Sequence, residues 1–124
     1  MQLDPKWLVF ADNDLQTAEI LLREEIWNQV CFHSQQAVEK YLKASLAPKS
    51  RPRSHKVTDL LTRIPVDLDE TLKKDLRRLD RFYIPTRYPD ALPGSIEEGM
   101  PTKEDAESAL CTAKALRSVL QKFL

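Results

Sequence analysis

The chain has 124 residues, of which 42% are hydrophobic and 31% charged, and its 19 basic and 19 acidic side chains give a formal net charge of zero. This length corresponds to one domain that buries about two-thirds of the surface of its unfolded chain. The charge balance excludes a basic coat over the whole surface, but it is compatible with a local basic patch. Only two glycines occur, which excludes glycine-rich phosphate loops and disfavours β-hairpins.

Cysteine and histidine usage gives no sign of a metal site. The chain has Cys31 and Cys111, two histidines, and neither a C-x-x-C nor an H-E-x-x-H pattern. We therefore expect two buried, reduced cysteines, with no metal and no cofactor. No signal peptide is recognisable, and no apolar run approaches the ~18 residues that span a bilayer. These features predict a cytoplasmic protein that does not enter a membrane.

The first predicted helix covers residues 5–25. Asp4 is a favourable N-cap, and Pro5 follows at the first helical position, where its missing N–H costs nothing. Apolar residues then recur at alternating spacings of three and four: Leu8, Ala11, Leu15, Ala18 and Leu22. This spacing predicts a helix that packs along a partner helix.

The second predicted helix covers residues 28–46 and is expected to be central. Small and apolar residues occupy more than one of its sides: Cys31, Ser34, Val38, Tyr41 and Ser45, with Phe32, Ala37 and Leu42 beside them. Such wide apolar cover predicts a helix with neighbours on several sides. Together with the apolar excess around Phe32, it also predicts a homodimer.

The same helix carries polar residues that form a candidate groove wall, namely His33, Gln36, Lys40 and Lys43. Other interpretations remain open for them. His33 fits a buried imidazole that pairs with another helix, and Glu39 with Lys43 fits an ordinary salt pair one turn apart.

Residues 48–56 form a predicted loop that contains four basic residues and no acid. Ser54 is the expected cap of a short helix over residues 55–63, and Pro65 closes that helix. His55 would then lie near free N–H groups, where a phosphate binds readily and where a neutral imidazole can act as a base. The candidate phosphate-binding residues here are Arg51, Arg53, His55 and Lys56. The alternative is a solvated polar loop.

A fourth helix is predicted from a capping box of Asp67 and Glu70 to about Tyr83. Its outer surface is basic through Lys73, Lys74, Arg77, Arg78 and Arg81. Such a face is either simply solvated or meets a phosphate backbone or an acidic partner.

Residues 84–101 contain four prolines and both glycines, which predicts a long loop. Arg87 can bind a phosphate and Tyr88 can stack on a base. Alternatively, Tyr88 pins the loop to the bundle and Arg87 pairs with Asp90. A final helix begins at Thr102, with Asp105 completing a capping box, and runs to the C-terminus.

These elements predict an all-α fold. The arrangement is an up-and-down antiparallel bundle of four main helices plus a short extra helix, in a single domain over residues 1–124.

Three segments resemble the HEPN family, the higher-eukaryote and prokaryote nucleotide-binding domain. The first is the stretch Cys31–Ala44, the second is His55 followed by Leu60 and Leu61 after a basic loop, and the third is residues 83–90 ahead of the last helix. The resemblance covers nearly the whole chain. It implies a helical bundle that is often a homodimer and is frequently paired with a small nucleotidyltransferase.

The resemblance also implies nucleotide or RNA binding, and for many members ribonuclease activity in toxin–antitoxin systems. Those ribonucleases carry an Arg followed, after four to six residues, by a His. Here three residues separate Arg51 from His55, one separates Arg53 from His55, and no His follows position 55. Whether the chain is an enzyme is therefore left open.

Three functions follow as hypotheses. The first is a nucleotide- or RNA-phosphate-binding module that acts with a nucleotidyltransferase in a toxin–antitoxin-like pair. The second is a metal-independent ribonuclease toxin in which His55 takes the 2′-hydroxyl proton and a nearby Arg stabilises the phosphorane. The third is a structural dimerisation domain without a ligand.

Overall fold

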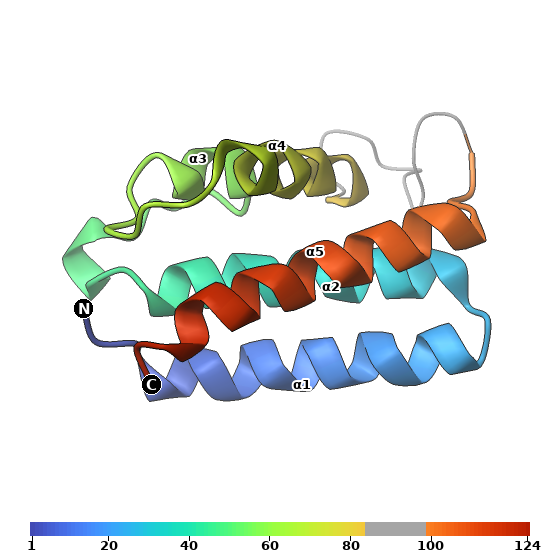
Figure 1. Cartoon of the computed structure of the whole chain (residues 1–124), viewed down its shortest axis with the longest axis horizontal. Coiled ribbons are helices and arrows are strands. Elements are labelled where there is room, and N and C mark those ends of the chain that lie inside the picture. The colour runs from blue at the N-terminus through green and yellow to red at the C-terminus, as the bar shows by residue number, and fades with distance from the viewer. Residues whose placement is uncertain (84–98) are drawn as a thin grey trace.

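Three long helices form the body of the molecule in this computed structural model, which describes residues 1–83 and 99–124 (Figure 1). They are α1 (Pro5–Arg23), α2 (Trp27–Ala44) and α5 (Lys103–Gln121). A second layer lies over α2 and α5 and contains α3 (Val57–Leu61), α4 (Glu70–Arg78) and the 3-10 turn η2 (Leu79–Phe82). A further 3-10 turn, η1 (Pro48–Ser50), follows α2. The predicted all-α helical bundle is confirmed.

The predicted helix starts at Asp4 and Thr102 are confirmed. The Asp4 carboxylate accepts from the backbone N–H of Lys6 at 3.0 Å, with Pro5 at the first helical position. At α5, Thr102 accepts from the Asp105 N–H at 3.2 Å, and the Asp105 carboxylate accepts from the Thr102 N–H at 2.9 Å. These reciprocal bonds satisfy N–H groups that a helix start leaves unpaired.

Helix α2 is central, as its sequence predicts, because α1, α3, η2 and α5 all pack against it. Its buried residues include the whole predicted stripe from Cys31 to Tyr41 and also Gln35, Glu39 and Lys43. Neighbours within one chain bury this wide apolar surface. The cover of α2 therefore gives no independent argument for a dimer.

The turn between α1 and α2 is closed by a Schellman motif. Glu25 N–H donates to Leu22 O at 3.1 Å, and Ile26 N–H donates to Leu21 O at 3.0 Å. Glu25 consequently has a φ of 60°, in the left-handed region that glycine normally occupies at this position.

The second layer corrects three sequence predictions. Helix α4 begins after Asp69, whose carboxylate accepts from the Leu72 N–H, so Asp67 is not its cap. It gives way to a 3-10 turn at Leu79 instead of continuing to Tyr83. Helix α3 is shorter than predicted and has Lys56, not Ser54, at its N-cap.

Cys31 is fully buried, and burial raises the pKa of its thiol to about 12. Cys111 is exposed, so the prediction of two buried cysteines is wrong for it. Position 111 lies on the outer side of α5, beside the buried residues Leu110 and Thr112. None of the helices among the described residues is long and apolar enough to span a membrane.

Candidate functional site

The candidate site is built around the loop that leads from η1 into α3. Arg53, His55 and Lys56 are exposed on this loop, and Arg53 and Lys56 have no ion-pair partner in the part of the chain that the structure describes. Their charges are therefore available to a ligand. Arg53 and Lys56 flank His55 in the sequence, and the exposed His55 ring contacts the buried Glu39 of α2.

Arg51 has a different role from its three neighbours. Its Nη2 lies 2.8 Å from the Asp4 carboxylate, and its Nε donates to the Lys43 carbonyl at 3.0 Å. The guanidinium also lies over the Trp7 ring, 5.4 Å from its centre. The hydrogen bond from Arg51 is the main reason that the pKa of Asp4 falls below its usual value. Arg51 therefore ties the basic loop to the start of α1 through two of its five N–H donors.

The His55 ring contacts a buried carboxylate, that of Glu39 in α2. The His55 side chain is 54% exposed, whereas that of Glu39 is 5% exposed, and His55 Nδ1 lies 3.2 Å from Glu39 Oε2. Lys43 Nζ lies 3.0 Å from the same oxygen and 3.5 Å from Nδ1. The contact with the Glu39 carboxylate requires a proton on Nδ1, whereas a hydrogen bond from Lys43 requires an unprotonated Nδ1. The Glu39 contact is the shorter of the two and favours the tautomer with its proton on Nδ1, which leaves Nε2 as the acceptor nitrogen.

An aromatic neighbour completes this arrangement. The Tyr83 ring lies 5.9 Å from the His55 ring, centre to centre, with the planes tilted by 30°. The two rings come from opposite ends of the second layer, before α3 and after η2. They provide a small aromatic surface next to the exposed cations.

The expected phosphate position at the start of α3 is already occupied by an acid of the chain itself. Asp80 in η2 accepts from the Val57 N–H at 2.7 Å and from the Thr58 N–H and hydroxyl at 3.0 and 2.6 Å. A helix start attracts negative charge, and here Asp80 supplies it. The prediction that free N–H groups of this helix accompany His55 is therefore wrong.

The predicted groove residues of α2 are mostly engaged with other parts of the chain. His33 Nδ1 lies 3.0 Å from Asp14 of α1, and Lys40 forms a short ion pair with the same carboxylate. Burial alone would raise the Asp14 pKa, but the hydrogen bonds from His33 and Lys40 outweigh burial and lower it. Two of the four residues thus hold α1 against α2, and His33 is the interhelical imidazole that one interpretation predicted.

Gln36 and Lys43 connect instead to His55. Gln36 Nε2 donates to Gln35 Oε1 at 2.7 Å, and Gln35 Nε2 donates to the His55 carbonyl at 3.3 Å. Lys43 pairs with Glu39, as expected for residues one turn apart, but both side chains are at least nine-tenths buried. The polar face of α2 therefore supports the His55 loop from beneath.

Sequence reasoning missed Glu39 and Tyr83 as parts of this site. The available signal for Glu39 was an acid on a helix with apolar residues on several sides, since such a charge is buried only when it is paired. Glu39 Oε1 is buried without a hydrogen-bond partner among the described atoms.

The predicted site residues Arg87 and Tyr88 lie outside the described residues. Within the described ranges, no group of three metal-ligating side chains occurs.

Comparison with known proteins identifies the family that shares this architecture. The family model described as HEPN domain matches residues 5–123. The chain belongs to the HEPN family. A crystal structure of TT1696 from Thermus thermophilus superposes with a TM-score of 0.76 at 35% identity, covering 96% of both chains. The crystal structure of ST0689, an archaeal HEPN homologue, superposes with a TM-score of 0.73 at 26% identity over the full length of both chains.

A curated relative adds a biological context. It comes from Methanocaldococcus jannaschii and is described as "Putative toxin MJ1304". It is 29% identical over an alignment of 126 positions, which covers 92% of this chain and 83% of the relative. The chain is thus similar to a protein that is described as a putative toxin.

Proposed function

We propose that this HEPN module binds the phosphates of a nucleotide or RNA at the loop of residues 53–56 and acts with a small nucleotidyltransferase partner. The observation that carries the proposal is that Arg53 and Lys56 are exposed on the same short loop as His55, whose ring lies 5.9 Å from that of Tyr83. Cations attract the phosphate backbone, and aromatic rings offer a surface on which a base stacks. A loop with this composition suits a single-stranded or mononucleotide ligand.

The rigidity of the site also supports binding. Arg51 ties the loop to Asp4, and Gln35 holds the backbone of His55. These contacts fix the loop before a ligand arrives, which lowers the entropy cost of binding. Arg87 and Tyr88 belong to the proposal from the sequence alone, as a second phosphate and base contact.

The partner and the oligomeric state are proposed on other grounds. The toxin-like relative favours a two-component toxin–antitoxin arrangement, and resemblance to the family favours a nucleotidyltransferase as the second component. For a homodimer, the outer surface of α1 leaves Val9 and Phe10 exposed by 57% and 59%. Light scattering of the purified chain tests the dimer, and co-purification with the product of an adjacent nucleotidyltransferase gene tests the partner.

A metal-independent ribonuclease is a second candidate, because the contact between Glu39 and His55 orients an imidazole as a base. In such a reaction, His55 Nε2 takes the 2′-hydroxyl proton, the 2′-oxygen attacks phosphorus, and the 5′-oxygen leaves with a proton from water or an acid. Arg53 is the exposed arginine on the same loop that can stabilise the phosphorane charge. The broken Arg–His spacing favours binding over cleavage.

Titration of fluorescently labelled RNA and of ATP at low salt tests the binding proposal. Neutralising the loop with Arg53→Gln and Lys56→Gln together should weaken binding by about tenfold or more, because two charge-assisted contacts are lost. Arg23→Gln, at the distant end of α1, is the matched control and should leave affinity unchanged. Absence of saturable binding to either ligand would overturn the binding proposal and leave a role through a protein partner or as a structural dimerisation domain. RNA cleavage that His55→Ala abolishes would establish the ribonuclease instead.

A further inference from the structure

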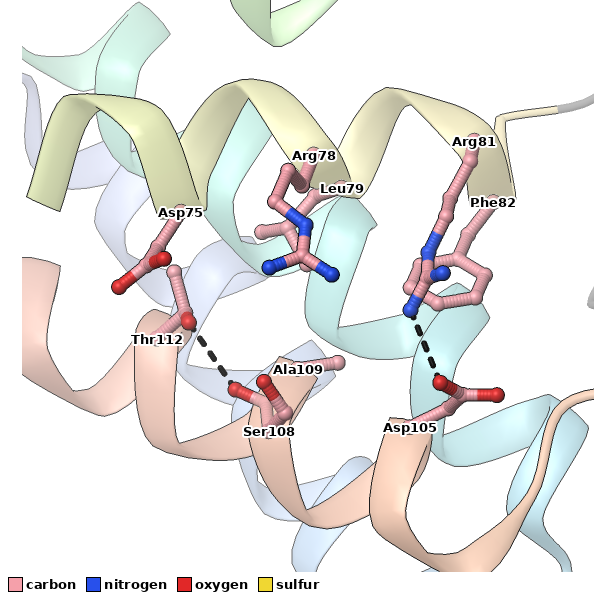
Figure 2. A pocket seen from close by; sticks show the side chains of 9 residues that line it. All are labelled: Asp75, Arg78, Leu79, Arg81, Phe82, Asp105, Ser108, Ala109 and Thr112. Carbon is pink, nitrogen blue, oxygen red and sulfur yellow. Dashed lines mark hydrogen bonds and ion pairs between the residues drawn. The ribbon is translucent and has the colours of Figure 1, made fainter. Parts of the chain in front are cut away.

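A second polar cleft lies away from the His55 loop, between α4 with η2 on one side and α5 on the other (Figure 2). It contains about 280 Å³ of space, part of which is open solvent. Its polar lining comprises Asp75, Arg78 and Arg81 from the second layer and Asp105, Ser108 and Thr112 from α5. None of these side chains takes part in the His55 site.

Two arginines enter the cleft, and their situations differ. Arg81 Nη2 lies 3.0 Å from Asp105, so its charge is compensated. The Arg78 guanidinium points from α4 toward α5, and no dashed line joins it to Asp75 or to any other labelled side chain (Figure 2). Arg78 has no ion pair or hydrogen bond with any described residue. A planar, exposed group with five donors therefore projects into the cleft without an acceptor from the described residues.

The α5 wall of the cleft leaves room beneath Arg78. Ala109 and Ser108 have short side chains, and Thr112 directs its hydroxyl to the Ser108 carbonyl at 3.0 Å. The Ser108 hydroxyl makes no hydrogen bond to the other side chains shown in Figure 2. A ligand between the two helices can accept from the guanidinium on one side and from this hydroxyl on the other.

The charge of α4 points to an anion as that ligand. Lys74 and Arg78 are one turn apart, as are Arg77 and Arg81, so like charges lie next to each other along the helix. Such pairs repel each other and destabilise a helix. Lys74, Arg77 and Arg78 have no ion-pair partner among the described residues, whereas Arg81 is paired with Asp105. A bound polyanion would compensate the three unpaired charges.

The charge balance within the cleft selects the kind of anion. Arg81 and Asp105 cancel, which leaves the cation of Arg78 with Asp75 near it. A singly charged oxyanion suits this balance better than a doubly charged one, because each further negative charge is repelled by Asp75 and Asp105. A phosphodiester of a nucleic-acid backbone carries one charge, and adjacent phosphodiesters would meet Lys74 and Arg77.

We propose that the cleft between α4 and α5 is a second phosphate site, in which Arg78 and Ser108 hold one phosphodiester of an RNA backbone while Lys74 and Arg77 contact its neighbours. This inference rests on the proposed function, since it takes RNA as the ligand, and it extends that function to a surface beyond the His55 loop. Arg78 is the anchoring residue, because it is the cation that projects into the cleft.

Fluorescence anisotropy with a labelled RNA of about 12 nucleotides, within the length that single-strand sites commonly cover, tests the cleft. We expect Arg78→Gln to weaken binding about tenfold and to lower the slope of log affinity against log salt by about 0.7, the value for one single-strand phosphate contact. Ser108→Ala should weaken binding by a smaller factor, about threefold. Arg23→Gln is again the control, and circular dichroism confirms that each variant folds.

The outcomes separate this inference from the proposed function. If Arg78→Gln leaves affinity and salt slope unchanged while Arg53→Gln with Lys56→Gln weakens binding, the cleft proposal is overturned and the loop proposal stands. The reverse pattern supports the cleft and overturns the loop. Binding of ATP without binding of the RNA also overturns the cleft proposal while leaving the loop as a nucleotide site.

Discussion

The contact between α1 and α2 and the layer of α3, α4 and η2 both carry many charges, but they use them in opposite ways. Between α1 and α2, Asp14 meets both His33 and Lys40, and Tyr41 donates a short hydrogen bond to Asp12, which also pairs with Arg117. In the second layer and the loop before it, six cations have no ion-pair partner among the described residues: Arg53, Lys56, Arg63, Lys74, Arg77 and Arg78. The difference indicates which charges hold the fold together and which are available to a ligand.

The largest effect is expected for the paired charges between α1 and α2, which we infer to stabilise the fold. Asp14→Ala removes the carboxylate shared by His33 and Lys40, both of which are mostly buried. Removing this carboxylate leaves Lys40 and the His33 ring without their partner, so we expect a loss of about 2–3 kcal/mol in the free energy of unfolding. Urea denaturation measures it, and the exposed neighbour substitution Asn13→Ala should change stability by less than about 0.5 kcal/mol. Equal effects of the two would show that the Asp14 contacts do not stabilise the fold.

For the unpaired cations of the loop we expect the opposite: their removal should affect ligand binding and not stability. Arg53→Gln with Lys56→Gln should weaken RNA or nucleotide binding by about tenfold, equivalent to ~1.4 kcal/mol, while unfolding stability stays within about 0.5 kcal/mol. The reason is that exposed, unpaired cations contribute little to folding. A stability loss as large as that of Asp14→Ala would mean that the loop charges are structural.

Acid unfolding sharpens the comparison further. Asp4 and Asp14 have pKa values lowered in the folded state, by Arg51 in the first case and by His33 and Lys40 against the effect of burial in the second. Carboxylates of this kind contribute stability that is present above their unfolded pKa of about 3.9 and is lost as the pH falls through the folded pKa. Unfolding free energy should therefore decline most steeply below about pH 4. Asp14→Ala should flatten that decline, whereas an unaltered profile in this variant would contradict the assignment.

The smallest expected effect concerns the turn that sets α1 against α2. Glu25 occupies the left-handed region at φ 60°, where a side chain is strained and glycine is not. Glu25→Gly should raise the unfolding free energy by about 0.5–1 kcal/mol in thermal or urea denaturation. Glu24→Gly is the matched control, because Glu24 has a φ of −85° and no strain to relieve. We expect that control to lower stability.

Local features could be predicted from the sequence with accuracy. The helix starts at Asp4 and Thr102 depend on residues at most three positions apart, and the central place of α2 follows from its apolar sides. Contacts between residues that are distant in the sequence could not be predicted. Asp80 caps α3 from 22 or 23 residues away, and Glu39 meets His55 across 16.

One local prediction failed, because Asp67 and Asp69 are both suitable N-caps and helix α4 uses Asp69. In the candidate site, the contacts between distant residues were what the sequence could not show. Composition identified the basic loop, but only the fold shows that Arg51 is engaged with Asp4 while Arg53 is not.

The most direct test of the account is a map of amide chemical shifts during titration of the isotopically labelled chain with a short RNA at low salt. If the unpaired cations of the second layer bind the ligand, saturable shifts should appear at residues 53–56, at Tyr83, along 74–81 and at Ser108, while Asp14, His33 and Lys40 stay unchanged. Shifts centred on the contact between α1 and α2, or no shifts at all, would contradict it.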